Sequence, residues 1–190
     1  MWVGGNLGAL LEAAKKRLEP TGRIIVQVEI NGQALIGAEL AKHRDDPITN
    51  ATVSLASADP RELALSTLEQ LQAYLKDAGE NLHQAGEMFQ TDRGAQAMRE
   101  LGKAMDVWHQ LPQALIQAAT LTKVNLDSLL TPPSTMTALT SDLADKLRML
   151  HEHLKNGDLV ALADALTYEW PMLVATWDQL IVNFVKKLRG

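Results

Sequence analysis

Apolar side chains recur with a helical period over most of this chain, and with a strand period in one region near its start. Between residues 7 and 18 the spacing of the leucines predicts an amphipathic helix, which Pro20 ends. Residues 23–30 then alternate between apolar and polar side chains, as expected for a half-buried strand. The apolar face of that strand is predicted to consist of Ile24, Val26, Val28 and Ile30.

A two-residue turn is predicted directly after this strand. Asn31-Gly32 is a strong hairpin signal, because a type I′ turn needs positive φ at both central residues. Residues 33–36 would return as a second strand, and residues 52–57 alternate again as a third. A three-stranded sheet with one apolar face must bury that face against another element. We therefore expect the sheet to lie on the helices that follow it.

The helical part begins at Asp59, which suits an N-cap before Pro60 at the first helical position. The next apolar positions alternate three and four apart, which predicts a helix of roughly 30 residues with a single apolar seam. Further seams follow over residues 98–119, 139–154 and 159–188. The breaks between the helices are expected near residues 91–94, at the proline-containing loop 131–136, and at Asn156-Gly157, after which Asp158 caps the last helix.

Two prolines lie inside otherwise continuous seams, Pro112 in the second and Pro171 in the last. Each proline removes one backbone hydrogen bond, so we expect a bent or broken helix at both positions.

These elements predict a mainly α protein of the α+β class: an antiparallel helical bundle with a small three-stranded antiparallel β element near the N-terminus. We expect a single domain over residues 1–190. Within it, residues 1–20 form the N-terminal helix, 21–58 the hairpin and third strand, and 59–190 the bundle.

Part of the sequence resembles a set of uncharacterised bacterial, mainly helical proteins with a strand-rich start. The similar segments are residues 53–63 leading into 68–75, then 157–171, and then Trp177. The resemblance extends over roughly residues 23–188 and contains no catalytic motif. It implies the architecture and no known activity.

Composition narrows the chemistry. The chain has 190 residues, no cysteine and a net charge of -5, which excludes thiol chemistry and disulfides and argues against nucleic acid as a partner. The apolar stretches are too short to span a membrane, and no basic region precedes the first one as in a signal peptide. We therefore expect a cytoplasmic protein without a membrane partner.

Two residue pairs suggest a di-metal bundle, Glu80 with His83 and Asp106 with His109. At 100° per residue, Glu80 and His83 lie roughly 160° and 100° from the centre of their apolar seam. The second pair lies roughly 130° and 70° from its own seam, whereas metal ligands in a bundle point inward. We therefore assign no metal, cofactor or catalytic residue, and a metal-binding bundle remains the last-ranked alternative.

Glu169 is the one carboxylate that suggests catalysis, because it lies beside Tyr168, Trp170 and a proline. A carboxyl group in such an apolar pocket can act as an acid. No Ser, His or second carboxylate accompanies it at a telling spacing, so an enzyme with a pocket near Glu169 remains an alternative.

The last helix has more apolar residues than one seam needs, and such a helix is buried either by its own bundle or by another chain. Val182 lies roughly 160° from the seam. The predicted function is a non-enzymatic interaction protein, acting as a dimer, scaffold, adaptor or chaperone-like module. Its interface is predicted to comprise Val174, Ile181, Val182 and Val185.

Overall fold

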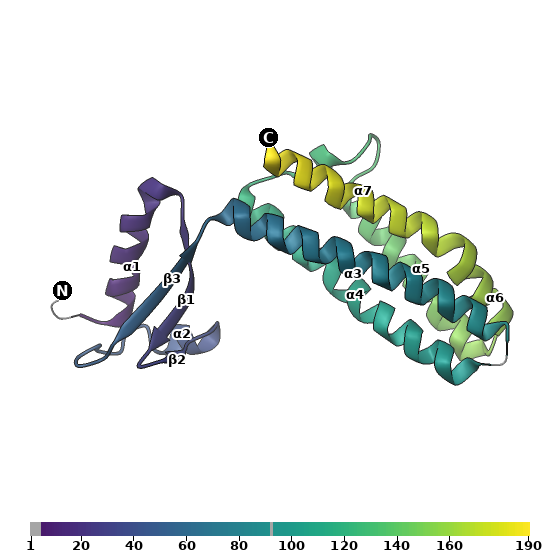
Figure 1. Cartoon of the computed structure of the whole chain (residues 1–190), viewed down its shortest axis with the longest axis horizontal. Coiled ribbons are helices and arrows are strands. Elements are labelled where there is room, and N and C mark those ends of the chain that lie inside the picture. The colour runs from purple at the N-terminus through teal and green to yellow at the C-terminus, as the bar shows by residue number, and fades with distance from the viewer. Residues whose placement is uncertain (1–4, 92) are drawn as a thin grey trace. The chain divides into compact units, whose positions relative to one another are not determined.

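The computed structural model describes residues 5–91 and 93–190 and confirms a mainly α fold of the α+β class (Figure 1). The chain divides into two compact units, residues 1–63 and 64–190, where the sequence analysis expects a single domain. Each unit has its own hydrophobic core, and the two cores share no residue. We therefore describe an N-terminal unit and a helical unit separately.

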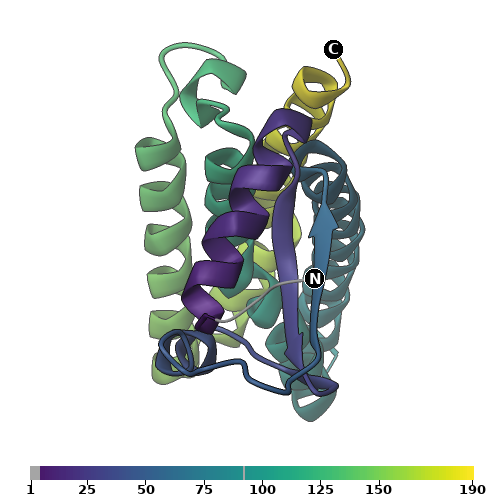
Figure 2. The ribbon, with the colours of Figure 1, turned by 90° about the vertical axis from the view of Figure 1, so that its left-hand side faces the viewer.

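The N-terminal unit packs a helix against a sheet (Figure 2). Helix α1 starts after Asn6, whose Oδ1 accepts a hydrogen bond from the Ala9 amide at 2.9 Å. The sheet is antiparallel with strand order β2-β1-β3. The elements of this unit are α1 (Leu7–Leu18), β1 (Ile24–Ile30), β2 (Gln33–Ala34), α2 (Ala38–Lys42) and β3 (Val53–Ala58).

The predicted hairpin turn is confirmed. Asn31 and Gly32 have φ values of 52° and 81°, and Ile30 pairs with Gln33 across the turn. Asn31 also ties the turn to the start of β3, because its amide donates to Thr52 O at 2.8 Å and its Oδ1 accepts from the Thr52 amide at 2.9 Å. The turn chemistry thus determines where both neighbouring strands begin.

The predicted apolar face of β1 is wrong in its first half. The pairing with β3 shifts register between Ile25 and Gln27, so Val26 is an extra residue at a β-bulge. The bulge reverses the alternation: Ile25 joins Val28 and Ile30 in the core, whereas Val26 is 46% exposed. Ile24 is half-buried and lies outside that core.

The cover of the sheet also differs from the prediction. Leu7 and Leu11 of α1 pack with Val28 and Leu35, and this cluster contains no residue of the long helices. The helix that covers the sheet is therefore the one that precedes it in the chain. Strand β2 is also shorter than predicted, with only two residues.

The helical unit consists of long antiparallel helices (Figure 1). Asp59 caps the first of these as predicted, since its Oδ1 accepts from the Arg61 amide at 2.7 Å. Gly157, with φ 67°, ends α5, and Asp158 Oδ1 accepts from the Ala161 amide at 3.0 Å. The elements are α3 (Pro60–Phe89), α4 (Gly94–Thr122), a 3-10 turn (Leu126–Leu129), α5 (Met136–Asn156), α6 (Leu159–Asp164), a π-helical turn (Ala165–Glu169) and α7 (Trp170–Arg189).

The loops of the helical unit follow the prediction where the structure describes them. Residues 131–135 are exposed and lie outside any helix, which two adjacent prolines would interrupt. The break predicted at residues 91–94 falls between α3 and α4, and its Asp92 lies outside the described residues.

Three tryptophans form the centre of the helical core. Trp108 of α4 meets Trp170 and Trp177 edge to face, with ring centroids 5.2 Å and 6.2 Å apart. All three side chains are at most 1% exposed, and Phe184 packs in the same cluster. Edge-to-face contacts of this kind orient the rings and so fix how α4 packs against α7.

The two internal prolines have different outcomes. The last helix is interrupted as predicted near Pro171: the five residues before α7 form a π-helical turn, in which the Trp170 amide donates to Ala165 O. At Pro112, by contrast, α4 continues through the proline without a break. Pro112 cannot donate the amide hydrogen that would bond to Trp108 O, so a bend there stays a prediction.

Candidate functional site

The predicted interface residues of the last helix lie in two different environments. Ile181 is fully buried in the helical core, so the bundle itself accounts for this residue. Val174 and Val185 are half-buried and pack against the core edge, and Val182 is half-buried. At 100° per residue, Val182 and Val185 lie within about 40° of Asp178, so these residues share one face of α7.

A groove of about 1000 Å³ lies between α7 and α3. Val174 and Asp178 line it, whereas Val182 and Val185 do not. The two helices are antiparallel neighbours here, since Glu69 of α3 meets Arg189 while the later Gly79 faces Val174. The floor of the groove is apolar. It consists of Ala73, Leu75, Gly79, Pro171, Val174 and Ala175.

Polar side chains form the rim of this groove. Glu69 accepts from Arg189 at 2.8 Å, and the Gln72 amide group donates to Asp178 at 2.9 Å. The Glu80 carboxylate lies 4.0 Å from the Lys76 ammonium group. Of these three carboxylates, Glu69 is paired with Arg189 and Glu80 lies near Lys76, so Asp178 gives the rim one unmatched negative charge.

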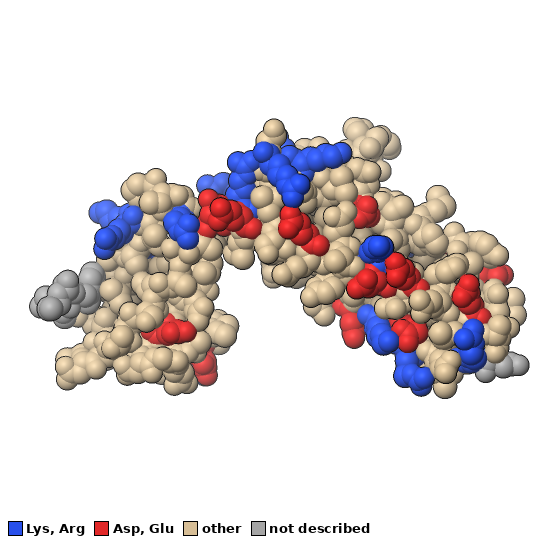
Figure 3. All heavy atoms as spheres, in the orientation of Figure 1, with Lys and Arg blue, Asp and Glu red and all other residues tan. Residues whose placement is uncertain are grey.

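Charge of both signs is visible over the bundle in the space-filling view (Figure 3). The last turn of α7 carries Lys186, Lys187 and Arg189, and basic side chains gather where this helix ends (Figure 3). A basic cluster at a helix C-terminus complements the helix dipole, so it needs no nucleic-acid ligand to explain it.

Glu169 lies apart from either groove. Its Oε2 accepts from the Lys146 ammonium group at 3.0 Å, and Tyr168 beside it is exposed. Neither residue borders the α3–α7 groove or the N-terminal groove described below. The structure therefore places Glu169 in an ion pair at the surface.

The candidate metal ligands also lie apart. His83 of α3 is 3.6 Å from Glu87, and His109 of α4 hydrogen-bonds Met105 O at 2.7 Å. Within residues 5–91 and 93–190, no three side chains of His, Asp or Glu come together in a way that could hold a metal ion. Over the same residues, no helix is long and apolar enough to cross a membrane.

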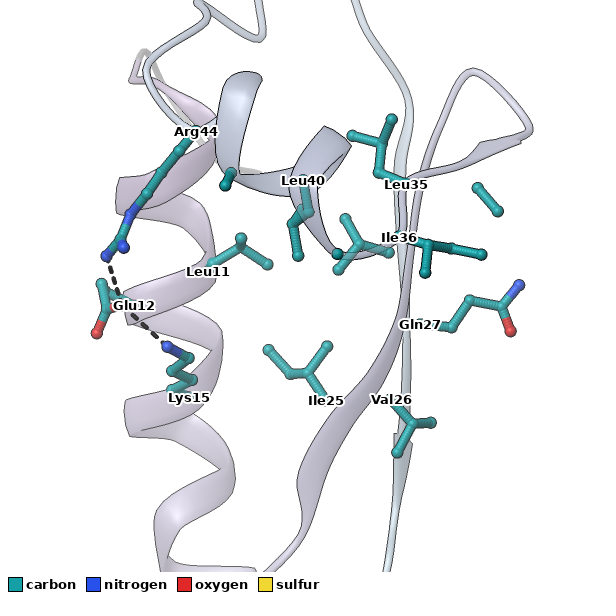
Figure 4. A pocket seen from close by; sticks show the side chains of 14 residues that line it. Leu11, Glu12, Lys15, Ile25, Val26, Gln27, Leu35, Ile36, Leu40 and Arg44 are labelled. Atoms are coloured by element: carbon teal, nitrogen blue, oxygen red, sulfur yellow. Dashed lines mark hydrogen bonds and ion pairs between the residues drawn. The ribbon is translucent and has the colours of Figure 1, made fainter. Parts of the chain in front are cut away.

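A second groove, of about 620 Å³, lies in the N-terminal unit (Figure 4). It opens between α1 and β1, and Leu40 of α2 points into it from one end. Leu11 and Ile25 approach it from opposite walls, so its interior is apolar. Ile36, which is 78% exposed, lies at its lip.

The charges of this second groove lie at its α1 wall, which Arg44 reaches from the segment after α2. Glu12 accepts from Lys15 at 3.1 Å and from Arg44 at 3.2 Å (Figure 4). A single carboxylate thus pairs with two cations. Together, Glu12, Lys15 and Arg44 therefore carry an excess of positive charge. The β1 wall is uncharged, with Gln27 as its polar side chain.

Sequence reasoning missed both grooves as cavities. One residue could have indicated the N-terminal groove. Gly37 lies shortly after β2, and glycine weakens a strand, so β2 could have been expected to be short. A short β2 leaves part of β1 uncovered. Of the four predicted interface residues, Val174 lines the α3–α7 groove and the other three do not. No pattern in one helix indicates which second helix lies beside it.

The structure defines an α+β protein, and each of its two units has a surface groove. Residues 66–180 match the family model described as "Domain of unknown function (DUF8042)", and the chain belongs to this family. The match lies within the helical unit and contains every residue that lines the α3–α7 groove. A domain of unknown function is consistent with an uncharacterised protein. No curated protein and no solved structure matches the chain.

Proposed function

We propose that this chain is a non-enzymatic interaction module whose α3–α7 groove binds an amphipathic helix of a partner protein. The observation that carries the proposal is the groove itself: apolar side chains, among them Val174 of α7, line a groove between two antiparallel helices. Helix-in-groove binding of this kind underlies adaptor and scaffold functions.

The length and shape of the groove fit a helix. Its α3 wall extends from Glu69 to Gln84, which at 1.5 Å per residue corresponds to about 22 Å, or about four helical turns. A third helix packs into the furrow between two neighbours by the same ridge-and-groove geometry that joins helices within a core. Small residues in the floor, Ala73, Gly79 and Ala175, allow its side chains to come close.

The charge of the rim specifies the kind of helix. Glu69 is neutralised by Arg189, whereas Asp178 has an uncharged amide as its partner and Glu80 lies 4.0 Å from its lysine. Basic side chains beside the apolar face of the ligand would pair with these carboxylates. We therefore favour a helix with apolar residues on one face and lysine or arginine at its edges.

The proposal is tested with two synthetic amphipathic helices that share their leucine positions and carry either lysine or glutamate elsewhere. We expect the lysine peptide to bind the full chain about ten-fold more tightly than the glutamate peptide in fluorescence anisotropy at low salt. Ala175→Arg, which fills the floor from an exposed helical position, should abolish binding of the lysine peptide.

The matched control is Met172→Arg, which adds the same charge to the same helix at a side chain that is 75% exposed and outside the groove. It should bind the lysine peptide as the wild type does. Equal binding by both variants, or by both peptides, would overturn the assignment. A wild-type dimer in sedimentation equilibrium that Ala175→Arg converts to monomer would assign the groove to a second copy and overturn the partner helix.

A further inference from the structure

Half of strand β1 has an open edge. On one side β1 pairs with β3 along its length, but on the other side β2 pairs only at Glu29 and Ile30, followed by one bond from the Leu35 amide to Val28 O at 2.8 Å. Among the residues that the structure describes, no strand pairs with residues 24–27 on that second side. Backbone groups on such an edge are free to pair with an added strand.

The apolar groove adjoins the same half of β1. Ile25, Val26 and Gln27 are all among the residues that line it. Ile25 points toward α1, which is the opposite wall, and Gln27 points away from it (Figure 4). A strand added beside residues 24–27 would therefore extend the sheet where β2 stops. Its side chains on the α1 side would enter the groove, because alternate residues of a strand point to the same face.

The groove has room for such side chains and apolar surface to receive them. Its volume of about 620 Å³ exceeds that of a single large side chain, and Leu11, Ile25 and Leu40 line its interior. Val26 and Ile36 at its edge are 46% and 78% exposed, so their apolar surface is in contact with solvent in the unbound chain. Covering such area contributes about 25 cal/mol per Å² to binding, less the ordering cost of the ligand.

We propose that the N-terminal unit binds an extended acidic-apolar peptide segment of a partner by strand addition to the open edge of β1. An apolar side chain enters the groove, and an acidic side chain two residues away reaches the α1 wall. There it meets Lys15 and Arg44, which share the single carboxylate of Glu12. This site is separate from the α3–α7 groove and takes a ligand of the opposite charge.

The charge of the α1 wall is the reason to favour such a peptide over a second copy of this chain. The open half of β1 itself reads Ile24-Ile25-Val26-Gln27 and contains no carboxylate. Pairing two such edges would leave the cations of both α1 walls unmatched, whereas an acidic peptide neutralises them.

The test uses a blocked seven-residue peptide in which Val, Val and Glu occupy alternate positions separated by Thr. We expect it to bind the full chain in isothermal titration. It should also slow hydrogen exchange of those amides of residues 24–27 that face the open edge and not β3. Two N-methylated versions, modified at the Val and Glu positions or at the Thr positions, block opposite edges of the peptide. One version should lose binding and the other should keep it, because only one edge of the peptide faces β1.

Lys15→Glu should weaken binding of the peptide by about five- to ten-fold. The matched control is Lys16→Glu, at an exposed position of the same helix that does not line the groove, and it should change the affinity by less than about two-fold.

Three outcomes would overturn the proposal. The first is loss of binding with both N-methylated peptides or with neither. The second is equal weakening by the two lysine variants. The third is concentration-dependent protection of residues 24–27 in the protein alone, which would assign the edge to a second copy.

Discussion

At the scale of single residues, the turn between β1 and β2 shows how much one backbone conformation can determine. Both Asn31 and Gly32 have positive φ, and only glycine and, to a lesser extent, asparagine and aspartate adopt this region at low cost. Asn31 then uses its side chain and its amide to hold Thr52, so the turn aligns β3 as well as β2. Such local chemistry can be read from a dipeptide, which is why this part of the fold was predictable.

Gly32→Val is expected to lower the free energy of unfolding of the N-terminal unit by about 1–3 kcal/mol, because a β-branched side chain resists positive φ. Nothing lies within 4 Å of the position that a Cβ would take, so the cost is in the backbone and not in a clash. Gly32→Asn is the control and should lose much less. Equal stability of Gly32→Val and the wild type in urea denaturation would contradict this account.

At the scale of elements, caps and seams were predictable, whereas contacts between distant elements were not. Asp59 and Gly157 act through neighbours in sequence, and both helix ends lie where their residue types indicate. The bulge at Val26 depends on the pairing of β1 with β3, and the cover of the sheet depends on Leu7 and Leu11 of α1. Such contacts depend on tertiary packing. The spacing of apolar residues in one segment does not indicate which other segment it packs against.

Helix α3 lies close to α6 and to the π-helical turn at Gly86. A Cβ on Gly86 would lie 2.7 Å from Thr167 Oγ1 and 3.2 Å from the Ala163 carbonyl oxygen. The carbonyl belongs to the backbone and cannot rotate away. The absence of a side chain at Gly86 therefore allows α3 to lie against the interrupted last helix.

Gly86→Ala should destabilise the helical unit by about 1–2 kcal/mol, since the strain of an added methyl group exceeds the helix propensity that alanine contributes. Gly102→Ala is the matched control. It lies within α4 with nothing near the added methyl group, and should instead stabilise by about 0.5–1 kcal/mol. Thermal unfolding followed by circular dichroism measures both, and a stabilising Gly86→Ala would contradict the close approach.

At the scale of the whole molecule, the chain combines two units with different chemistry. The helical unit contains the family match and a groove with an acidic rim, whereas the N-terminal unit has a groove whose α1 wall is basic. Sequence periodicity predicted most helices and strands of both units, but it did not indicate that they form two compact units. The division depends on which apolar faces pack together. The apolar face of the sheet packs against α1 and not against the long helices.

A fragment of residues 59–190 tests this division, because it keeps the Asp59 cap and every residue of the helical core. We expect it to remain helical and to unfold cooperatively, with a midpoint within a few degrees of that of the helical unit in the full chain. Its core contains no residue of the N-terminal unit, so removing that unit exposes none of the core contacts described here.

The same fragment separates the two binding proposals. It should bind the lysine amphipathic peptide as the full chain does, because the whole α3–α7 groove lies within it. It should not bind the acidic strand peptide, because β1 and α1 are absent. A fragment that loses its cooperative transition would show that the helical unit depends on the N-terminal one, and retained binding of the strand peptide would place that ligand on the helices instead.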